Sequence, residues 1–444
     1  MAETKKKIPI VEIISKEMIK PSLPTPSHLR AHQISSFDQL ADLCYIRVVF
    51  FYNRPFAGED AVSGESNDII QVLKSSLSET LTHYYPLAGK FVEDALVIDC
   101  DDSGAEFTTA VIVGGDDGEF LGAIENPDMD FLEKLVSKEH NMTKTDDVIL
   151  AVQITRFPAG EVTVGICISH KISDAATLSS FLKLWSTAAK ILISGESSFE
   201  ELIPLGPVFD APRIWPSVPG LTRPSLNFNE EKIIVKKFVF NSSSLARLKS
   251  ELMVGGDIVP TRVTSTMALI WHTIMNSSSG PQTPTNHVLA FPSNIRKIMS
   301  PPLPDNTLGN IIKLVMVGNC VDGVALEVVL SLIKEAIGKM DEEYAKKKGV
   351  PFHEPFFKVF SSEYKLNMTI ITSWCWFPFY EVEMGLGRPV WMTCLRRPAV
   401  SDILLIDGPD GGIEALIGLN VETMDKIEKN PNIISFCDHS ITYG

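Results

Sequence analysis

A histidine and an aspartate stand four positions apart in the stretch "GICISHKISDAATLSSFL", which runs from Gly165 to Leu182. An imidazole within hydrogen-bond reach of an alcohol can remove its proton as the oxygen attacks a carbonyl, so His170 is a candidate general base. A plainer interpretation is also open. Asp174 would cap a helix, and His170 would be a buried, hydrogen-bonded residue. The spacing alone is too short a pattern to decide between them.

The residues around this pair predict a strand followed by a helix. In "VTVGICIS" successive side chains alternate between faces, which puts His170 on the face opposite to Cys167 and disfavours a cysteine–histidine relay. After Asp174, apolar residues recur with the period of an amphipathic helix. They are Leu178, Phe181, Leu182, Trp185 and Ala189. His170 is thus expected to end the strand, and Ser173 or Asp174 to begin the helix.

Two other chemistries are disfavoured for this region. Ser173 lacks the surroundings of a nucleophile elbow, although acylation of its hydroxyl stays open. A metal site would need further ligands, and the "HLRAH" segment from His28 to His32 lacks the glutamate of a zinc-protease helix. It follows "PSLPTPS", which is typical of extended coil. We interpret both histidines as surface or packing residues and expect no metal.

Composition excludes several classes of protein. The chain has 444 residues, enough for two domains, and 45% of them are hydrophobic. A net charge of −15 argues against a nucleic-acid partner, but a local basic cluster would still hold a small anionic cofactor. No apolar run reaches the length of a membrane span. The seven scattered cysteines form no CxxC pair, so thiols in a reducing cytosol are expected.

Strand-like and helix-like segments alternate along the whole chain, which predicts an α/β or α+β fold with mixed sheets. The expected strands cover 43–52, 148–157, 162–169 and 233–240. The expected helices cover 67–84, 243–253, 264–275 and 322–348. The second and third strands, joined by a Pro-Ala-Gly-Glu turn, predict a β-hairpin. A stretch rich in Pro, Gly and Ser, from about Ser194 to Arg223, predicts a linker between two halves of similar size.

Six motifs, one of them the segment of His170 and Asp174, occur in a fixed order along the chain. They are "IKPSLPTPSHLRAHQISSFDQL" (19–40), "HYYPLAGKF" (83–91), "ISHKISDA" (168–175), "TRVTSTMALIW" (261–271), "PSNIRKIMSPPLPDNTLGN" (292–310) and "TSWCWFPFYEVEMGLGRPVW" (372–391). Together they resemble the BAHD acyltransferases, which transfer acyl groups from acyl-CoA. The similarity covers nearly the whole chain, and it is greatest to the branch that acetylates alkaloid and terpenoid alcohols.

This resemblance implies a two-domain fold of the chloramphenicol-acetyltransferase type with a central solvent channel between the domains. The first domain would span 1–195, joined by 375–397. A crossover linker would span 196–222, and the second domain 223–444. Acyl-CoA, most simply acetyl-CoA, would enter the channel from one face as a co-substrate, and a small-molecule alcohol from the other. The expected protein is a cytoplasmic monomer with no tightly bound cofactor and no membrane partner.

The resemblance also assigns roles to individual residues. His170 would be the catalytic base, and Asp174 would point away from the substrate and pair with Arg296, fixing the loop. Thr372 would stabilise the oxyanion of the tetrahedral intermediate, unless it is an ordinary strand threonine. Trp374 would lie beside it in the acceptor channel.

The phosphates of CoA require positive or hydrogen-bonding partners in an acidic protein, although most Lys and Arg side chains are simply solvated. Hydroxyl or backbone groups near a helix start are also suitable donors. The candidate residues are Thr261, Arg262, Thr264, Lys297, Lys313 and Arg388.

The second family motif, usually Asp-Phe-Gly-Trp-Gly, is altered here to Glu383-Met-Gly-Leu-Gly. Gly385 and Gly387 preserve the backbone freedom of the motif, so we expect altered packing and structural support of the site. Glu383 is a candidate second acid/base by analogy, with a structural role as the alternative. Trp376 stands where the related branch often carries arginine.

Three functions remain open at this point. The leading hypothesis is acyl-CoA-dependent O-acylation of an alcohol. The second is hydrolysis, in which water replaces the alcohol or Ser173 is acylated. The third is a binding protein that keeps the channel and has lost turnover, as the altered second motif allows. The identity of the acceptor cannot be read from the sequence.

Overall fold

The computed structural model describes residues 9–53, 65–114, 118–125, 127–142, 147–195, 199–222, 232–253, 259–278, 287–321, 323–344, 367–395, 402–408 and 410–443. The chain divides into two compact units. Unit 1 comprises Met1–Arg223, Pro304–Ile311 and Phe377–Arg396. Unit 2 comprises Pro224–Leu303, Ile312–Trp376 and Arg397–Gly444. Each unit is thus built from segments that are distant in the sequence.

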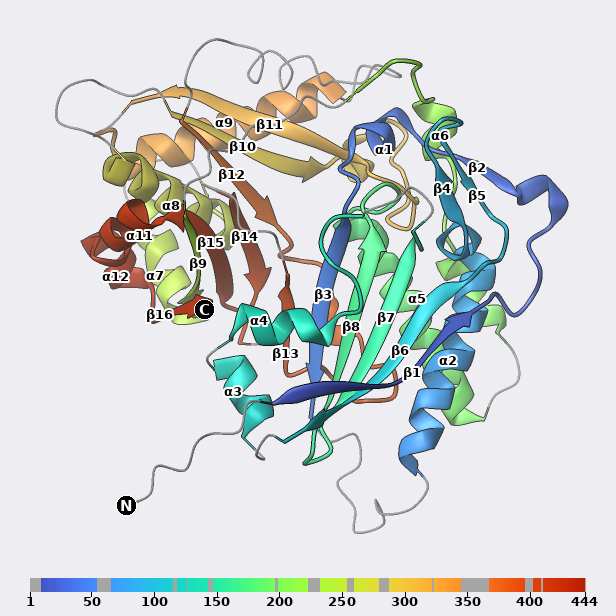
Figure 1. The fold of residues 1–444 in the computed structure, drawn as a ribbon. Helices are drawn as coiled ribbons and strands as arrows, with labels where there is room; N and C mark the ends of the chain where they lie inside the picture. Colours follow the sequence, from blue (N-terminus) through green and yellow to red (C-terminus); the bar gives the residue numbers. More distant parts are fainter. Residues whose placement is uncertain are drawn as a thin grey trace, which may run out of the picture. The chain divides into compact units, whose positions relative to one another are not determined.

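Unit 1 contains a six-stranded mixed sheet, drawn in Figure 1. In spatial order its strands are β1 (Ile10–Ile19), β6 (Ala105–Val113), β7 (Leu150–Arg156), β8 (Val162–Ser169), β3 (Tyr45–Tyr52) and β13 (Trp391–Cys394). Only β6 and β7 pair in parallel. Every residue of β3 and β8 is buried, as their apolar composition requires. The short β13 joins the edge of this sheet from far along the chain.

Two long helices of unit 1 pack against each other, α2 (Glu65–His83) and α5 (Ala175–Ser194). The indole Nε1 of Trp185 in α5 donates to the Leu73 carbonyl and the Ser76 hydroxyl of α2, which ties the pair together. On β8, Gly165 lets the Leu135 carbonyl approach, because a Cβ at this position would meet that oxygen at 2.0 Å. The remaining elements of unit 1 are small. They are α1 (Ser36–Leu40), α3 (Glu119–Glu125), α4 (Met129–Leu132), α6 (Ala211–Ile214), the 3-10 turns η1 (Ser27–Leu29), η2 (Tyr85–Ala88), η3 (Glu133–Leu135) and η4 (Glu200–Leu205), and a small sheet of β2 (Ala31–Gln33), β5 (Val97–Asp99) and β4 (Lys90–Val92).

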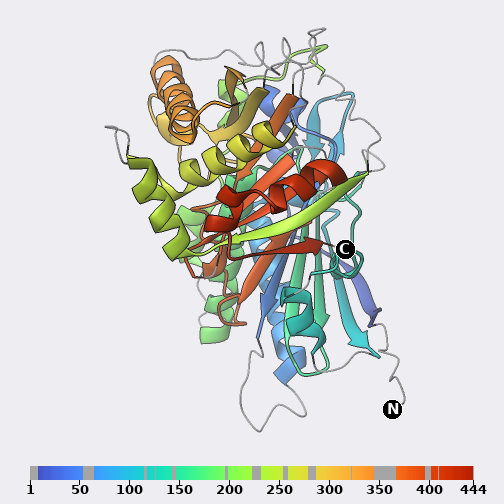
Figure 2. The same ribbon diagram turned by 90° about the vertical axis from the view of Figure 1, so that its left-hand side faces the viewer.

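The described residues of unit 2 form a seven-stranded mixed sheet and five helices, seen from another side in Figure 2. The strands in spatial order are β11 (Ile312–Cys320), β10 (His287–Asn294), β12 (Asn367–Ser373), β14 (Asp402–Asp407), β15 (Ile413–Asn420), β9 (Ile233–Phe240) and β16 (His439–Tyr443). The helices are α7 (Ser242–Met253), α8 (Arg262–Ser278), α9 (Leu326–Tyr344), α11 (Val421–Glu428) and α12 (Pro431–Phe436). Two further 3-10 turns are η5 (Arg296–Ile298) in unit 2 and η6 (Phe379–Glu381) in unit 1.

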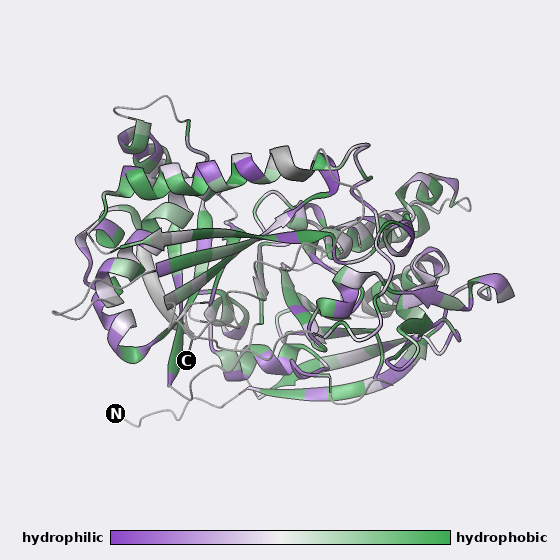
Figure 3. Ribbon diagram, turned by 90° about the horizontal axis from the view of Figure 1, so that it is seen from above, coloured by the Kyte–Doolittle hydropathy of each residue, from purple (hydrophilic) through white to green (hydrophobic). Residues whose placement is uncertain are grey.

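The hydropathy of the residues explains how the sheets and helices pack within each unit. In Figure 3 the strands of both sheets are largely hydrophobic, whereas the helices carry hydrophobic and hydrophilic stretches. Helix α8 is central in unit 2, where it packs against α7, α9, α11, α12 and β12. Its residues from Thr264 to Met275 are accordingly buried, apart from the partly exposed His272.

The predicted α/β fold with mixed sheets is confirmed. The predicted hairpin is the antiparallel pair β7–β8. The segment interpreted as coil before His28 ends in the 3-10 turn Ser27–Leu29. No helix among the described residues is long and apolar enough to span a membrane.

Candidate active site

His170 lies in the turn that follows β8 and precedes α5. The strand ends at Ser169, one residue earlier than predicted. The His170 backbone N–H donates to the Cys44 carbonyl at 2.8 Å, which continues the sheet by one hydrogen bond. The residue is partly exposed at this position. A histidine that follows a fully buried strand is therefore presented at the end of that strand rather than enclosed in the core.

Both carboxylate oxygens of Asp174 accept backbone hydrogen bonds. Oδ1 accepts from the Thr177 N–H at 2.8 Å and so caps α5. Oδ2 accepts from the Ile311 N–H at 3.0 Å. The cap interpretation of Asp174 is thus confirmed, and Asp174 rather than Ser173 is the cap residue. These hydrogen bonds direct the Asp174 carboxylate at the backbone. They are therefore compatible with His170 as a general base and with His170 as a packing residue.

The end of the fifth motif and the residue after it, "TLGNI" from 307 to 311, hold the loop of His170. The Asn310 side-chain Nδ2 donates to the His170 carbonyl at 2.7 Å. Thr177 Oγ1 donates to the Gly309 carbonyl at 3.1 Å and accepts from the Gly309 N–H at 3.2 Å. Gly309 adopts a φ of 117°, which a residue with a Cβ rarely does. The loop is therefore attached to a segment 140 positions away.

A buried carboxylate, that of Asp38, secures Asn310 in turn. Asp38 Oδ1 accepts from the Asn310 backbone N–H at 2.7 Å and from its Nδ2 at 2.9 Å. Asp38 Oδ2 accepts from the Ser35 N–H at 2.9 Å and hydroxyl at 2.6 Å. Burial raises the pKa of Asp38, while the hydrogen bonds from Ser35 and Asn310 act in the opposite direction. A chain of contacts thus runs from Asp38 through Asn310 to the His170 carbonyl.

Lys171 fixes the loop on the other side of His170. Its ammonium group donates to the Gln39 carbonyl at 3.0 Å and to the Ala41 carbonyl at 2.6 Å. The N–H of His170, its carbonyl and the neighbouring side chain are all held by unit 1. Preorganisation of this kind keeps a catalytic group in its productive geometry.

The alternative nucleophiles in this region are buried and engaged. Burial raises the pKa of the Cys167 thiol to about 12, so this sulfur stays protonated at neutral pH. The buried Ser173 hydroxyl donates to the Asp174 carbonyl at 3.0 Å. His32 packs against the Phe209 ring, and burial lowers its pKa to about 4. The predicted packing role of His32 is thus confirmed. The described residues contain no group of three or more potential metal ligands.

The altered second motif is anchored on α5. Ser186 Oγ accepts from the N–H groups of Glu383 and Met384, both at 3.2 Å. The Glu383 carboxylate lies 2.6 Å from Lys190 Nζ and 3.5 Å from Arg388 Nε. The hydrogen bond from Lys190 lowers the pKa of Glu383. A carboxylate held ionised by two cations suits a structural role better than proton transfer.

The two glycines of this motif adopt left-handed backbone conformations. Gly385 and Gly387 both have φ of 79°. At Gly385 a Cβ would also meet the Cδ1 of Ile193 at 2.2 Å, but Ile193 is an exposed side chain that can move aside, so the left-handed conformation is what requires glycine. These requirements explain why glycine stands at both positions although the aromatic residues of the motif are replaced.

We expect Glu383→Gln to lower kcat by less than about tenfold, whereas loss of a general acid or base typically costs about 10²–10⁴. The side chain is 31% exposed, so its ion pairs contribute at most about 1 kcal/mol. Because the pKa of Glu383 is lowered, this contribution is present above the ordinary glutamate pKa of about 4.3 and is lost as the pH falls further. Urea unfolding at neutral and acidic pH measures it. A hundredfold fall in kcat with an unchanged fold would restore the acid/base role.

The candidate CoA ligands at the start of α8 are engaged within unit 2. The Thr261 hydroxyl accepts from the Thr264 N–H at 3.1 Å, and the Thr264 hydroxyl accepts from the Thr261 N–H at 3.0 Å. Arg262 Nη2 lies 2.6 Å from the Asp407 carboxylate. The hydroxyls therefore cap α8, and the charge of Arg262 is balanced. Their role toward a phosphate stays a prediction.

The other candidates in unit 2 lie on or beside its sheet. Thr372 is partly exposed on β12 and pairs with Leu404 of β14. Trp374 is buried, and its backbone N–H donates to the Leu405 carbonyl at 2.8 Å. Arg296 is fully buried, and its Nη1 donates to Asn294 Oδ1 at 3.2 Å. Lys297 is exposed and Lys313 partly exposed. The pairing of Asp174 with Arg296 stays a prediction.

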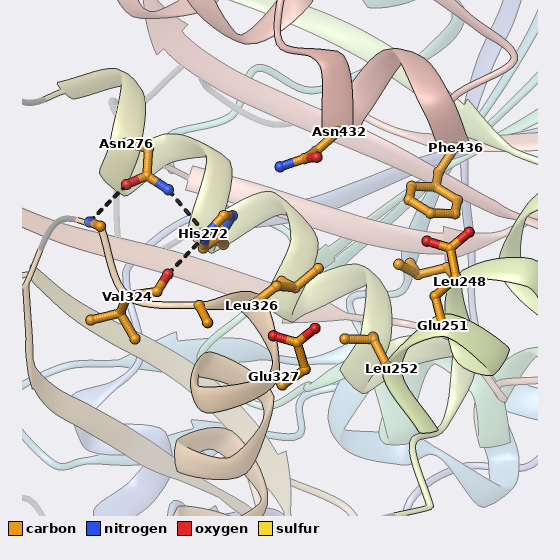
Figure 4. A pocket seen from close by; sticks show the side chains of 12 residues that line it. Leu248, Glu251, Leu252, His272, Asn276, Val324, Leu326, Glu327, Asn432 and Phe436 are labelled. Atoms are coloured by element: carbon orange, nitrogen blue, oxygen red, sulfur yellow. Dashed lines mark hydrogen bonds between the residues drawn. The ribbon is translucent and has the colours of Figure 1, made fainter. Parts of the chain in front are cut away.

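Unit 2 also has a surface pocket with a volume of about 460 Å³, shown in Figure 4. Leu248, Leu252 and Phe436 are buried at its lining. His272 Nε2 lies 3.0 Å from the Val324 carbonyl, and burial lowers the pKa of its imidazole. Asn276 Oδ1 accepts from the Gly323 N–H at 3.0 Å. These α8 side chains bind the turn that precedes α9, which gives them a structural role.

Comparison with known proteins places the chain among transferases. The model of the Transferase family matches residues 10–434. Epi-neemfruitin B synthase L1AT of Melia azedarach is 34% identical over 453 residues, covering 96% of this chain and 98% of its own. Salutaridinol 7-O-acetyltransferase of Papaver somniferum is 31% identical over 431 residues, covering 86% and 88%. The crystal structure of vinorine synthase matches with a TM-score of 0.79 and 27% identity, covering 97% of this chain and 99% of that one.

Proposed function

Because the chain belongs to the Transferase family of BAHD acyltransferases, we propose that it transfers an acetyl group from acetyl-CoA to a hydroxyl of an alkaloid or terpenoid alcohol. The acyltransferase class follows from the family itself. The acetyl donor is supported by the name of a relative, salutaridinol 7-O-acetyltransferase, which states both the group transferred and the oxygen that accepts it.

In the proposed reaction His170 removes the proton of the acceptor hydroxyl while the oxygen attacks the thioester carbonyl carbon. The C–S bond then breaks, and the imidazolium returns the proton to the departing thiolate. Thr372 would donate a hydrogen bond to the developing oxyanion, a contribution of the order of 3 kcal/mol in other enzymes. Trp374 would line the acceptor side. The central channel, the cytoplasmic location and the monomeric state stay predictions.

One observation carries this proposal: the turn that bears His170 is fixed on both sides. Its N–H is bound to Cys44, its carbonyl to Asn310, and the following side chain to two carbonyls of the α1 region. A histidine needed only for packing would not require a partly exposed position with its backbone so fully restrained. A backbone fixed in this way limits how far the imidazole can move, which favours proton transfer to a bound substrate.

The test is incubation of the purified chain with acetyl-CoA and a panel of hydroxylated alkaloids and terpenoids, read by mass spectrometry. The expected product carries one acetyl group on an acceptor oxygen, with one equivalent of free CoA. Longer acyl-CoAs in the same panel define the donor. Rapid CoA release without any acceptor would instead indicate a hydrolase. Binding of acetyl-CoA with neither release nor transfer would indicate a protein without turnover.

A further inference from the structure

Trp376 combines two properties that are rarely found together. The residue is 69% exposed. Among the described residues, the other large hydrophobic residues that are exposed are all aliphatic. Its backbone φ is 78°, in the left-handed region. For a residue with a bulky side chain this conformation is a genuine outlier, and such strain persists only when the surroundings impose it.

A three-residue network in unit 2 imposes this conformation. The Trp376 N–H donates to Asp407 Oδ2 at 2.8 Å, which fixes the backbone. The Arg262 guanidinium lies over the indole ring, 4.2 Å from its centroid. Arg262 is itself held, because its Nη2 lies 2.6 Å from Asp407 Oδ1 and its Nη1 donates to the carbonyls of Gly411 and Gly412. The side chain of Arg262 is only 18% exposed, so the ring rests on a rigid base.

This arrangement presents a flat surface and little net charge. Arg262 covers part of the indole, and its charge is balanced by Asp407, so the cluster is poorly suited to hold a phosphate. The exposed remainder of the ring offers an immobile apolar π-surface. Holding such a ring rigid in advance removes the entropic cost of ordering it on binding, which favours stacking with another planar ring.

We propose that the exposed face of Trp376 is a stacking platform for a planar ring of a bound substrate, with Arg262 and Asp407 as its positioning residues. The inference rests on the proposed function for the identity of the substrates. The same chemistry is available from two sources, the adenine ring of acyl-CoA and the ring system of the acceptor alcohol. The experiment separates these two sources.

The informative variants are Trp376→Gly and Trp376→Phe. Glycine removes the ring and adopts the left-handed backbone without strain, so Trp376→Gly is expected to fold with an unchanged or higher Tm. Phenylalanine keeps a planar face. Calorimetric titration measures the affinity of each variant for coenzyme A and for 2-naphthalenemethanol, a planar alcohol. Ile434→Ala, which alters an exposed apolar residue on α12 of the same unit, serves as the control.

Trp376→Gly is expected to weaken one of the two probes about tenfold, the equivalent of about 1.4 kcal/mol, while Trp376→Phe stays close to wild type. Weakened coenzyme A identifies the adenine, and weakened 2-naphthalenemethanol identifies the acceptor ring. Unchanged coenzyme A affinity, together with unchanged or undetectable binding of the alcohol, overturns the platform. Both titrations are independent of turnover. If Trp376→Gly binds both probes with wild-type affinity and still transfers acetyl groups, the platform alone is refuted. If binding depends on the ring at position 376 but no acetyl transfer occurs, the proposed function alone is refuted.

Discussion

His170→Ala is expected to lower kcat by about 10²–10⁴ while the affinity for acetyl-CoA stays close to wild type. The imidazole is the group that would take the proton of the acceptor, and alanine offers no substitute. Alanine keeps the backbone N–H and carbonyl through which Cys44 and Asn310 hold this turn, so folding should be preserved. Steady-state kinetics with the acceptor found in the panel measures kcat, and calorimetric titration with acetyl-CoA measures binding.

Cys167→Ala is the matched control, because Cys167 lies on β8, the strand that leads to His170, and its thiol is buried and protonated. We expect this variant to keep most of its activity. Two results would count against the mechanism: His170→Ala with wild-type kcat, or Cys167→Ala without activity, which would direct attention to the thiol.

Asp38→Asn is expected to lower the free energy of unfolding by about 2–4 kcal/mol and to reduce kcat at temperatures where the variant is folded. Each oxygen of Asp38 accepts two hydrogen bonds. If the amide nitrogen replaces Oδ1, both N–H donors of Asn310 lose their acceptor. If it replaces Oδ2, the Ser35 N–H loses its acceptor, whereas the Ser35 hydroxyl can turn to accept. The Asn310 clamp on the His170 carbonyl weakens as a result. Urea unfolding measures the free energy of unfolding. Steady-state kinetics tests whether the orientation of His170 is lost, by comparing the change in kcat with the change in KM.

The exposed Asp101 of the same unit supplies the control. Asp101→Asn should leave the free energy of unfolding within about 0.5 kcal/mol of wild type and leave kcat unchanged. A double-mutant cycle with Asp38→Ala and Asn310→Ala should give a coupling energy above about 0.5 kcal/mol, as contacting residues do. Strict additivity of the two changes, or wild-type kcat in Asp38→Asn, would separate Asp38 from the loop of His170.

Elements with local signals could be predicted from the sequence. The β7–β8 hairpin follows from two apolar runs around a Pro-Ala-Gly-Glu turn, and α5 from its capping aspartate and its apolar stripe. The acyltransferase fold with mixed sheets that the six motifs predict is confirmed by the match to vinorine synthase. These predictions succeed because each depends on neighbouring residues or on ordered motifs.

The contacts of the site were not predictable in the same way. Asp38 stands in "SSFDQL" and reads as an ordinary capping residue, and its partner Asn310 is 272 positions away. The positive charge of Arg262 makes it a candidate phosphate ligand, but no local signal in the sequence indicates that Asp407 balances this charge. Glu383 is engaged by Lys190 of α5 in the same way. Tertiary partners of charged residues leave no trace in spacing or periodicity.

The segmented composition of unit 1 limits how the protein can be divided. A fragment that ends at residue 223 would lack β13 at the edge of its sheet. It would also lack Asn310 and Ile311, leaving the carboxylates of Asp38 and Asp174 without donors that they bind in the intact chain. The N-terminal half is therefore not an autonomous module. Activity assays, domain swaps and permuted chains must supply these short later segments in cis or as added peptides.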